Sequence, residues 1–433
     1  MNGASEERLI AYENARLLDP ASGYDGPGAL IVAGGRISDM GPDAVPPRGA
    51  ERVDCGGLAL CPGLVDMRVF TGEPGAEHKE TFATVSAAAA AGGVTTLVVM
   101  PDTDPAIDDA AILEFVSRRA RASAQVNILP MAALTKGVAG AEMTEIGLLQ
   151  AAGAVGFTDG RRAIADAGLM RRLLAYASTF DALIAPYAED ASLASGVMNE
   201  SEMSARLGLP GTPAAAETLT LERDLTLAGM EGARYHASQI TCAASLNAVA
   251  AARAAGVDVT CAASINHLVL NELDVGDYRT FLRMNPPLRG EADRLALVEG
   301  LASGALDIIV SSHDPQPPEN KRLPFAEATP GAAGVETLLA AALTLHHEGA
   351  VPLLGLLAAL TCNPARRLGL EAGRLAPGAP ADFNLIDLDA PFVVKPSELS
   401  SRSQNTPFEG RLMQGRVMRT ICGGETIFER RPA

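Results

Sequence analysis

Short apolar runs alternate with alanine- and leucine-rich stretches through the middle of the chain. This alternation is typical of buried parallel strands joined by crossover helices. The runs with the length and composition of strands are residues 64–69, 95–100, 127–132, 154–158, 182–187, 232–237, 258–262 and 307–312. Eight strand–helix repeats predict an α/β fold, a TIM-type (β/α)8 barrel.

The two ends of the chain follow another pattern, in which brief apolar runs are separated by turn residues. Such runs flank Gly34-Gly35 near the start and Gly423-Gly424 near the end, and both are hairpin signals. We therefore expect β-structure at both ends and a barrel between them. The expected boundaries are 1–60 for the first β-part, 61–372 for the barrel and 373–433 for the second β-part.

Composition and charge fit a large soluble protein of the enzyme type. The chain has 433 residues, 48% of them hydrophobic, which is enough for a barrel and an accessory domain. It has no tryptophan and only 4% aromatic residues, so the core must consist mainly of alanine, leucine and valine. The formal net charge of -17 argues against a nucleic-acid partner, which requires a basic surface.

The N-terminal segment 1–7 is polar and acidic, and the chain contains no uncharged apolar run long enough to span a membrane. We therefore expect a cytoplasmic protein without membrane contact. The cysteines are scattered and form no Cys-x-x-Cys pair, which favours small buried side chains over metal ligands. They are Cys55, Cys61, Cys242, Cys261, Cys362 and Cys422.

A recognisable frame surrounds the first two barrel strands. It consists of Cys-Pro-Gly-Leu-Val-Asp at 61–66, Glu-Pro-Gly at 73–75, Ala-Gly-Gly-Val-Thr-Thr at 91–96 and Met-Pro-Asp-Thr at 100–103. The frame resembles the amidohydrolase superfamily, and specifically the dihydroorotases, and the resemblance covers nearly the whole chain. It implies the same barrel, with both chain ends joined in one small β-sandwich, and a zinc-dependent site at the strand ends.

The first strand departs from the family at its ligand positions. After Pro-Gly-x-x-Asp the family has two histidines that hold zinc and an arginine that holds the substrate carboxylate. Here these positions are Arg68, Phe70 and Gly72. A guanidinium has no lone pair to give and repels a cation, phenylalanine offers no ligand, and glycine cannot form a carboxylate clamp.

The later strands depart in the same way. By the resemblance, Asp159 keeps the carboxylate that lies at the metals, whereas Tyr187 and Gln239 replace ligand histidines. Ser312 replaces the aspartate that binds metal and acts as general base, and serine alone cannot take a proton from zinc-bound water. Arg68 is expected either to pair with Asp159, as a positive group in place of the cation, or to point to solvent.

Of the positions that contact substrate in the family, some are kept in this sequence and others are changed. Asn285 matches a substrate-contacting asparagine, whereas Asp102 replaces another asparagine and Gln316 replaces a substrate-contacting histidine. The segments that persist are mostly scaffold, among them residues 208–213, 285–289, 323–325, 334–337 and 361–365.

Five of the six ligand positions thus lack a suitable donor, so we expect no catalytic residue, no bound metal and no other cofactor. The sequence predicts a non-catalytic dihydroorotase homologue of pyrimidine biosynthesis. The family includes dihydroorotase-like subunits that associate with aspartate transcarbamoylase, and the resemblance implies that enzyme as the partner in an oligomer.

The alternative is that the chain is an active enzyme. It would be a dihydroorotase or a related cyclic amidohydrolase that cleaves a cyclic amide C–N bond with a rebuilt site. His236, His267 and His313 lie near the ends of strands six to eight, and with Asp159 and Asp314 they form a candidate displaced metal site. Neutral structural hydrogen bonding explains these histidines equally well.

Overall fold

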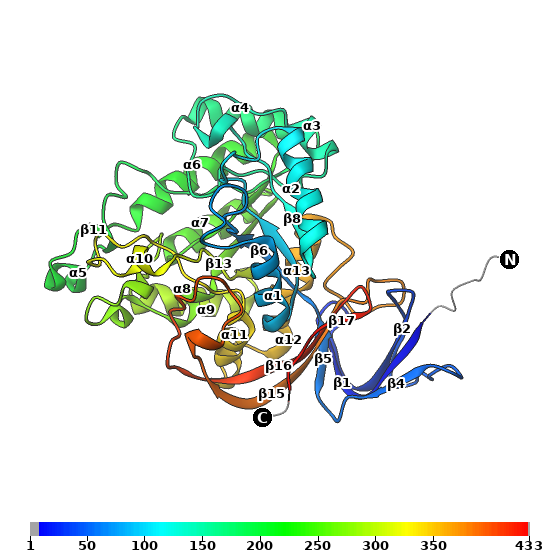
Figure 1. Cartoon of the computed structure of the whole chain (residues 1–433). Helices are drawn as coiled ribbons and strands as arrows, with labels where there is room; N and C mark the ends of the chain where they lie inside the picture. The colour runs from blue at the N-terminus through cyan, green and yellow to red at the C-terminus, as the bar shows by residue number, and fades with distance from the viewer. Residues whose placement is uncertain (1–7, 432–433) are drawn as a thin grey trace.

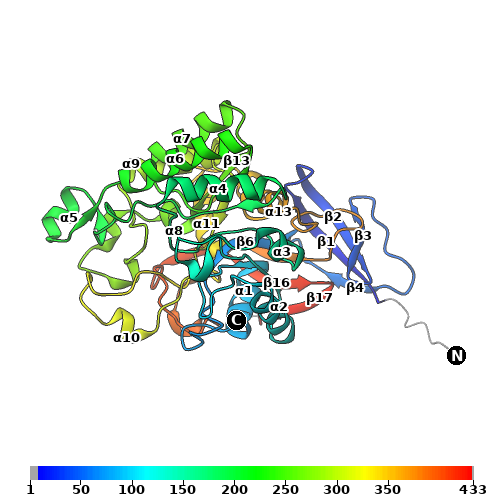
Figure 2. The same cartoon turned by 90° about the horizontal axis from the view of Figure 1, so that it is seen from above.

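The structure, a computed structural model, describes residues 8–431. A barrel with an outer layer of helices forms the larger part of the molecule, and a sheet built by both chain ends lies beside it (Figure 1). Figure 2 shows the same two parts from above, with the N-terminal strands to one side of the helical layer. The predicted α/β barrel is confirmed.

The barrel strands are parallel and follow one another in chain order around the wall. They are β6 (Leu64–Val69), β7 (Val94–Val99), β8 (Asn127–Pro130), β9 (Leu183–Ile184), β12 (Arg234–Ala237), β13 (Val259–Ser264) and β14 (Ile308–Val310). The fourth position is a short segment around Phe157, which bridges Ala132 on one side and Ile184 on the other. A bridge between Val69 and His313 closes the ring.

The fourth predicted strand is therefore present only as a short ladder. Glycines at 153 and 156 flank its start, and glycine weakens a strand because it has no side chain to pack. Backbone N–H groups of Val155 and Phe157 still donate to the neighbouring strands. The wall is thus continuous in spite of the low strand content at this point.

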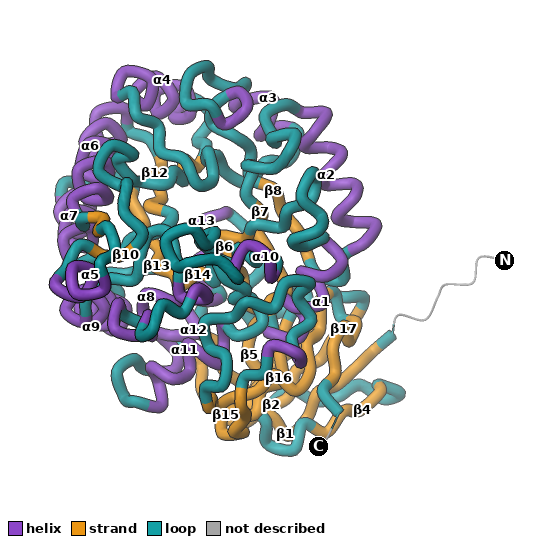
Figure 3. Tube along the Cα trace, turned by 60° about the vertical axis from the view of Figure 1, so that its left-hand side comes forward, coloured by secondary structure: helices purple, strands orange, loops and turns teal. Residues whose placement is uncertain are grey.

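Helices surround the strands, as the tube in Figure 3 shows. They are α1 (Phe82–Gly92), α2 (Ala110–Ser123), α3 (Ile146–Ala151), α4 (Ala167–Ser178), α5 (Glu202–Leu207), α6 (Ala215–Glu231), α7 (Ala243–Ala254), α8 (Ile265–Val269), α9 (Glu291–Ser303), α10 (Pro318–Lys321), α11 (Leu338–His347), α12 (Leu353–Leu360) and α13 (Cys362–Leu368). Local sequence sets their ends: Thr81 caps the first turn of α1, and Gly93 ends that helix with φ of 80°.

The two chain ends form one eight-stranded sheet in which β5 pairs with β15. Its strands are β1 (Leu9–Asp19), β2 (Tyr24–Ala33), β3 (Arg36–Gly41), β4 (Glu51–Asp54), β5 (Ala59–Pro62), β15 (Phe383–Val393), β16 (Leu412–Cys422) and β17 (Glu425–Glu429). A two-stranded sheet of β10 (Met198–Asn199) and β11 (Gly211–Thr212) lies apart from it.

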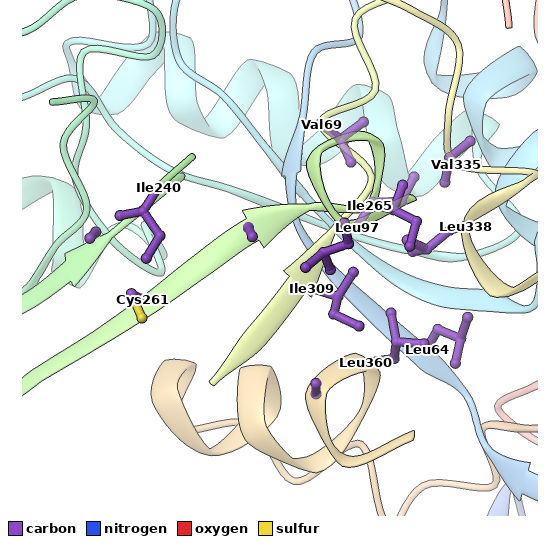
Figure 4. Packing of buried hydrophobic residues seen from close by; sticks show 14 of the residues in the cluster. Leu64, Val69, Leu97, Ile240, Cys261, Ile265, Ile309, Val335, Leu338 and Leu360 are labelled. Carbon is purple, nitrogen blue, oxygen red and sulfur yellow. The ribbon is translucent and has the colours of Figure 1, made fainter. Parts of the chain in front are cut away.

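Aliphatic side chains fill the core, as the composition predicts. Figure 4 shows part of the largest cluster, where Leu64 of β6, Ile309 of β14 and Leu360 of α12 lie close together. A second cluster fills the sheet of the chain ends, where the rings of Tyr12 and Phe383 meet edge to face at 4.8 Å. All six cysteines are free thiols, and five of them are buried. Within residues 8–431 no helix is long and apolar enough to cross a membrane.

Candidate functional site

The carboxyl ends of the barrel strands surround a small cavity of about 60 Å³. This is the face at which barrel enzymes carry their active sites. The cavity brings together most of the residues that the sequence singles out: Arg68, Phe70, Tyr187, Gln239, Asn285 and Ser312. His267 and Asp314, named in the sequence as parts of a candidate displaced metal site, lie on the same wall, and the structure adds Arg161, Ser264 and Asn266.

Arg68 lies near the end of β6 and is buried, with 3% of its surface exposed. Its guanidinium lies 5.1 Å from the ring centre of Phe70 and 5.5 Å from that of Tyr187. Its Nη2 donates to the carbonyl of Gly160 at 3.3 Å, whereas Nε and Nη1 have no hydrogen-bond partner. Burial lowers the pKa of this guanidinium. The expectation that Arg68 pairs with Asp159 or points to solvent is therefore wrong on both counts.

The carboxylate of Asp159 is occupied elsewhere. Its Oδ1 accepts the backbone N–H groups of Leu134 and Thr135 at 2.8 and 2.9 Å, and its Oδ2 accepts the Thr135 hydroxyl. Burial raises the pKa of Asp159 against these hydrogen bonds. The loop after β8 therefore holds this carboxylate, which explains why it does not reach Arg68.

The other residues that depart from the family, Tyr187, Gln239 and Ser312, form hydrogen bonds through uncharged side chains. Ser312, at a positive φ of 48°, donates from Oγ to Oε1 of Gln239 at 2.8 Å. Across the cavity, Nδ2 of Asn285 donates to the Tyr187 hydroxyl at 3.0 Å and to Glu189 at 3.4 Å. Burial raises the pKa of Tyr187 well above its ordinary value, so this hydroxyl keeps its proton.

Arg161 forms a clasp on one side of the cavity, which no motif in the sequence predicts. Its Nη1 donates to Asp102 at 2.5 Å, while Nε and Nη2 donate to Asp314 at 2.9 and 2.8 Å. The guanidinium stacks 3.7 Å from the ring centre of Phe70. Gln316, which the sequence analysis named as a substituted substrate contact, donates to the same Asp314 at 2.9 Å. One signal was available, because a carboxylate in place of the family's asparagine at 102 calls for a cation nearby.

The backbone of Gly72 excludes the side chain that the family carries there. Its φ is +73°, a conformation that other residues rarely adopt. A Cβ atom at this position would lie 2.6 Å from the carbonyl oxygen of Ala76. Gly72 and Asp102 line a second cavity of about 170 Å³ on the outer side of the clasp. An arginine therefore cannot take up the position of Gly72 without a change in the loop.

Asp66 lies on β6, two residues before Arg68, and has no exposed surface. Its Oδ1 accepts the backbone N–H groups of Ser311 and Arg68 at 3.1 and 3.3 Å, whereas Oδ2 has no partner. Burial raises the pKa of Asp66 to about 6. This region therefore contains a buried carboxyl and a buried guanidinium that are both poorly satisfied.

The residues present do not fit a zinc ion. Among residues 8–431 no three or more His, Cys, Asp or Glu side chains come together in a way that holds a metal. His236 faces a threonine hydroxyl at 2.8 Å, and His267 faces two proline carbonyls at 3.2 and 3.3 Å. His313 accepts a backbone N–H at 3.1 Å and lies 3.4 Å from the buried Glu80. The displaced metal site with Asp159 and Asp314 is therefore not assembled.

Comparisons with known proteins agree with the frame in the sequence. Residues 57–245 match the family model described as dihydro-orotase-like, and residues 339–428 match that of the amidohydrolase family. The chain is 40% identical to a dihydroorotase of Anaplasma phagocytophilum, over 98% of this chain and 96% of that protein. It is also 40% identical to a dihydroorotase of Ehrlichia chaffeensis, over 99% of this chain and 97% of that protein.

Solved structures show the same fold at lower sequence identity. An L-hydantoinase (dihydropyrimidinase) from Arthrobacter aurescens superposes with a TM-score of 0.89 and 23% identity, over 97% of this chain and 96% of that chain. A dihydropyrimidinase from Brevibacillus agri gives a TM-score of 0.85 and 20% identity, over 97% and 95% of the two chains. At these identities the likeness concerns the barrel and the attached sheet alone.

Proposed function

Because the chain belongs to the dihydroorotase family, we propose that it is a non-catalytic member, a subunit that assembles with aspartate transcarbamoylase in pyrimidine biosynthesis. One observation carries the proposal: the guanidinium of Arg68 is buried at the position where the family has its first zinc ligand. A guanidinium is a permanent cation without a lone pair. It takes the place of a ligand and also opposes the ion that the ligand would bind.

The repulsion is large on the scale of zinc binding. A single positive charge about 4 Å from a doubly charged ion is repelled by roughly 8 kcal/mol at an effective dielectric constant of about 20. Structural zinc sites bind their ion by about 10 to 16 kcal/mol, with a full set of protein ligands. Here the one remaining family carboxylate, Asp159, already accepts three hydrogen bonds. These residues therefore support a protein without zinc chemistry.

The cavity also offers no activated nucleophile among the described residues. A serine hydroxyl needs a neighbouring base, but the Ser312 hydroxyl donates to the amide oxygen of Gln239. Burial lowers the pKa of His236 to about 3 and that of His267 to about 4, so both rings are neutral at pH 7 and are weak bases. One nitrogen of each ring is also in a hydrogen bond: Nδ1 of His236 with the Thr260 hydroxyl, and Nε2 of His267 with the Pro286 carbonyl.

The test is an activity assay in both directions, the hydrolysis of dihydroorotate and the cyclisation of carbamoyl aspartate with release of water, on protein purified with added zinc. We expect well under one equivalent of bound zinc and no turnover. The catalytic alternative keeps a specific observation in its favour, which is the 40% identity over nearly the full length to proteins named dihydroorotase. Stoichiometric zinc together with turnover would replace the present proposal by that alternative.

The proposed partner is tested by co-expression with aspartate transcarbamoylase from the same organism. We expect one larger particle on size-exclusion chromatography and a partner that unfolds at a higher temperature in the complex, because a subunit that binds only the folded partner stabilises it. Arg68→Met is the matched control, since its side chain is buried and should not alter the assembly. Separate elution at micromolar concentration would contradict the assembly.

A further inference from the structure

Another cavity lies on the seam between the barrel and the sheet of the chain ends, and it shares no lining residue with the cavity at the barrel mouth. The last turn of α1 and the first turn of α11 form its barrel side, and β15, β16 and Arg430 form the other side. α11 packs against β16 here (Figure 1). This seam cavity, lined by Glu336, Phe392, Arg416 and Arg430 among others, has a volume of about 60 Å³.

The two arginines of the seam cavity are half-buried and are held at its wall. The guanidinium of Arg416 stacks 4.7 Å from the ring centre of Phe392, and Nε of Arg430 donates to the carbonyl of Val417 at 3.0 Å. Phe392 and Val417 also line the cavity. Asp387 lies opposite Arg416 in the sheet, but it does not line the cavity, and its Oδ1 accepts two backbone N–H groups. Within residues 8–431 neither arginine therefore has an ion-pair partner.

The terminal nitrogens of both arginines are accessible. Nε of Arg416 is enclosed, but Nη1 and Nη2 of Arg416 and of Arg430 keep accessible surface and make no hydrogen bond to any described residue. Nε of Arg430 is already occupied by the Val417 carbonyl. The terminal nitrogens are therefore left to donate to water or to a ligand, and a guanidinium donates most strongly to an oxyanion.

The charges around the seam cavity leave a positive excess when all of them are counted. Lys395 and Glu398 neutralise each other in an ion pair of 2.7 Å. Arg416 and Arg430 are then opposed only by Glu336, whose pKa burial raises to about 7. Burial and the nearby charge of Arg416 both lower the pKa of Arg430. An anion relieves the repulsion between these two cations.

Shape and charge favour a tetrahedral dianion over a carboxylate. A phosphate group has oxygens enough to accept from two guanidiniums at once, and its double charge matches two cations. The first turn of α11 adds the positive end of a helix to the same wall. A cavity of about 60 Å³ holds several non-hydrogen atoms, since one water takes about 10 to 15 Å³ on this measure.

We propose that the seam cavity binds a phosphate group through Arg416 and Arg430, either as free phosphate or as the phosphate of an ester. The bound group joins β16 to the first turn of α11, and so the sheet of the chain ends to the barrel. The inference rests on this cavity alone. It holds whether or not the chain is catalytic and whether or not it has a protein partner.

The test measures the thermal midpoint of the full chain at about pH 8, where a phosphate group is mainly a dianion. Inorganic phosphate is added up to ~10 mM at constant ionic strength, and the rise in midpoint gives an apparent dissociation constant. We expect a rise of about 1 to 3 °C at roughly ten times that constant. Acetate, a planar monoanion, should bind at least about tenfold more weakly.

Ribose 5-phosphate separates the two sources of a phosphate group. Tighter binding of this ester than of inorganic phosphate assigns the site to a phosphate ester, whose remaining atoms contact the open side near the exposed Val393 and Lys395. Equal or weaker binding assigns it to free phosphate.

The variants test the residues that make the site. Arg416→Gln and Arg430→Gln should each weaken phosphate binding by about tenfold or more, because each removes charge-assisted hydrogen bonds. Glu336→Gln should tighten it by about two- to fivefold, because the opposing carboxylate is removed. The matched control is Arg419→Gln, which removes an arginine of β16 that pairs with Glu429 and does not line the cavity.

Arg419→Gln should keep the dissociation constant of the unmodified protein within about twofold, since general salt effects act alike on all variants. The absence of a rise in the unmodified protein would overturn the proposal. Equal phosphate binding by the Arg416 and Arg430 variants, acetate binding as tight as that of phosphate, or weaker binding by Glu336→Gln would each overturn it as well.

Discussion

Two arginines in this molecule are equally buried, and their surroundings differ sharply. Arg289, in a segment that keeps the family sequence, donates to Thr241, Asn199 and Thr212 at 2.9, 3.2 and 2.9 Å and lies 4.0 Å from the carboxylate of Glu217. Arg68, at a position where the family has a zinc ligand, makes one long hydrogen bond and no ion pair. Both have 3% of their surface exposed.

The difference separates two kinds of buried charge. Arg289 has partners on several elements, as a charge that supports the fold requires, whereas Arg68 is buried with a single hydrogen bond. The comparison predicts opposite responses when each charge is removed.

The largest expected effect comes from Arg289→Met. It leaves Glu217 buried without its cation and removes three hydrogen bonds, so we expect a loss of about 3 to 5 kcal/mol in the free energy of unfolding. Arg68→Met, the matched variant, should change this free energy little or increase it. Equilibrium urea unfolding of both variants measures the contrast, and equal losses would end the distinction between the two sites.

The second effect depends on pH and concerns Asp66, two residues before Arg68. Its folded pKa of about 6 is above the value of about 3.9 in an unfolded chain, so the folded protein binds the proton more tightly. The group favours folding when protonated, and that contribution is lost as the pH rises from about 4 through 6. Asp66→Asn should therefore gain about 3 kcal/mol relative to the unmodified protein between pH 4 and pH 7.

A flat difference between Asp66→Asn and the unmodified protein over this pH range would show that the carboxyl is already satisfied. The control is Asp25→Asn, because Arg16 holds the pKa of that exposed carboxyl below its usual value. Its difference from the unmodified protein should stay nearly constant between pH 4 and pH 7. It should change, with the opposite sign, only below about pH 4, and by little because the pair is exposed.

A smaller effect is expected from Arg161→Ala, which opens the clasp. The Arg161 side chain is 41% exposed, so its two ion pairs are partly screened, but Asp102 and Asp314 are only 12% and 13% exposed and would be left without their cation. We expect a loss of about 1 to 2 kcal/mol in the free energy of unfolding. Arg161→Lys keeps the charge but cannot donate to both carboxylates in the same planar geometry. In urea unfolding, the free energy of unfolding of Arg161→Lys should lie between that of the unmodified protein and that of Arg161→Ala. A loss of several kcal/mol would place Arg161 with Arg289, among the scaffold charges.

The smallest expected effect is none. Restoring both histidines of the first strand, by Arg68→His and Phe70→His, should give no dihydroorotate hydrolysis with added zinc. Tyr187, Gln239 and Ser312 still withhold ligands and a base, and groups that act as a unit are strongly non-additive. Turnover by this double variant would show that the later strands supply the missing groups after all.

The barrel could be predicted from the sequence because buried strands and helices leave a periodic pattern in the chain. The strand-end rule also identified Arg68, Tyr187, Gln239 and Ser312 as neighbours, and all four line the cavity. What escaped prediction was the partner that each side chain selects. Asp159 accepts a hydrogen bond from Thr135 because of the conformation of the loop after β8, and no pattern in the sequence predicts that conformation.

Contacts between distant segments escaped prediction for a related reason. Arg161 reaches Asp102 and Asp314, which are 59 and 153 positions away in the chain, and no local pattern couples them. His313 was expected near the mouth of the barrel, but its ring faces the buried Glu80. Which way a strand-end side chain turns is decided by packing against neighbouring elements.

The loop at Gly72 has a consequence for any carboxylate clamp built into this protein. An arginine introduced there would place its Cβ 2.6 Å from the Ala76 carbonyl, on a backbone at φ of +73°. A side chain in that conformation costs about 1 to 2 kcal/mol before the clash is counted. Gly72→Arg alone would therefore destabilise the chain. Residues 72–76 would have to adopt another path first, so the order of the two changes decides whether the clamp can be built.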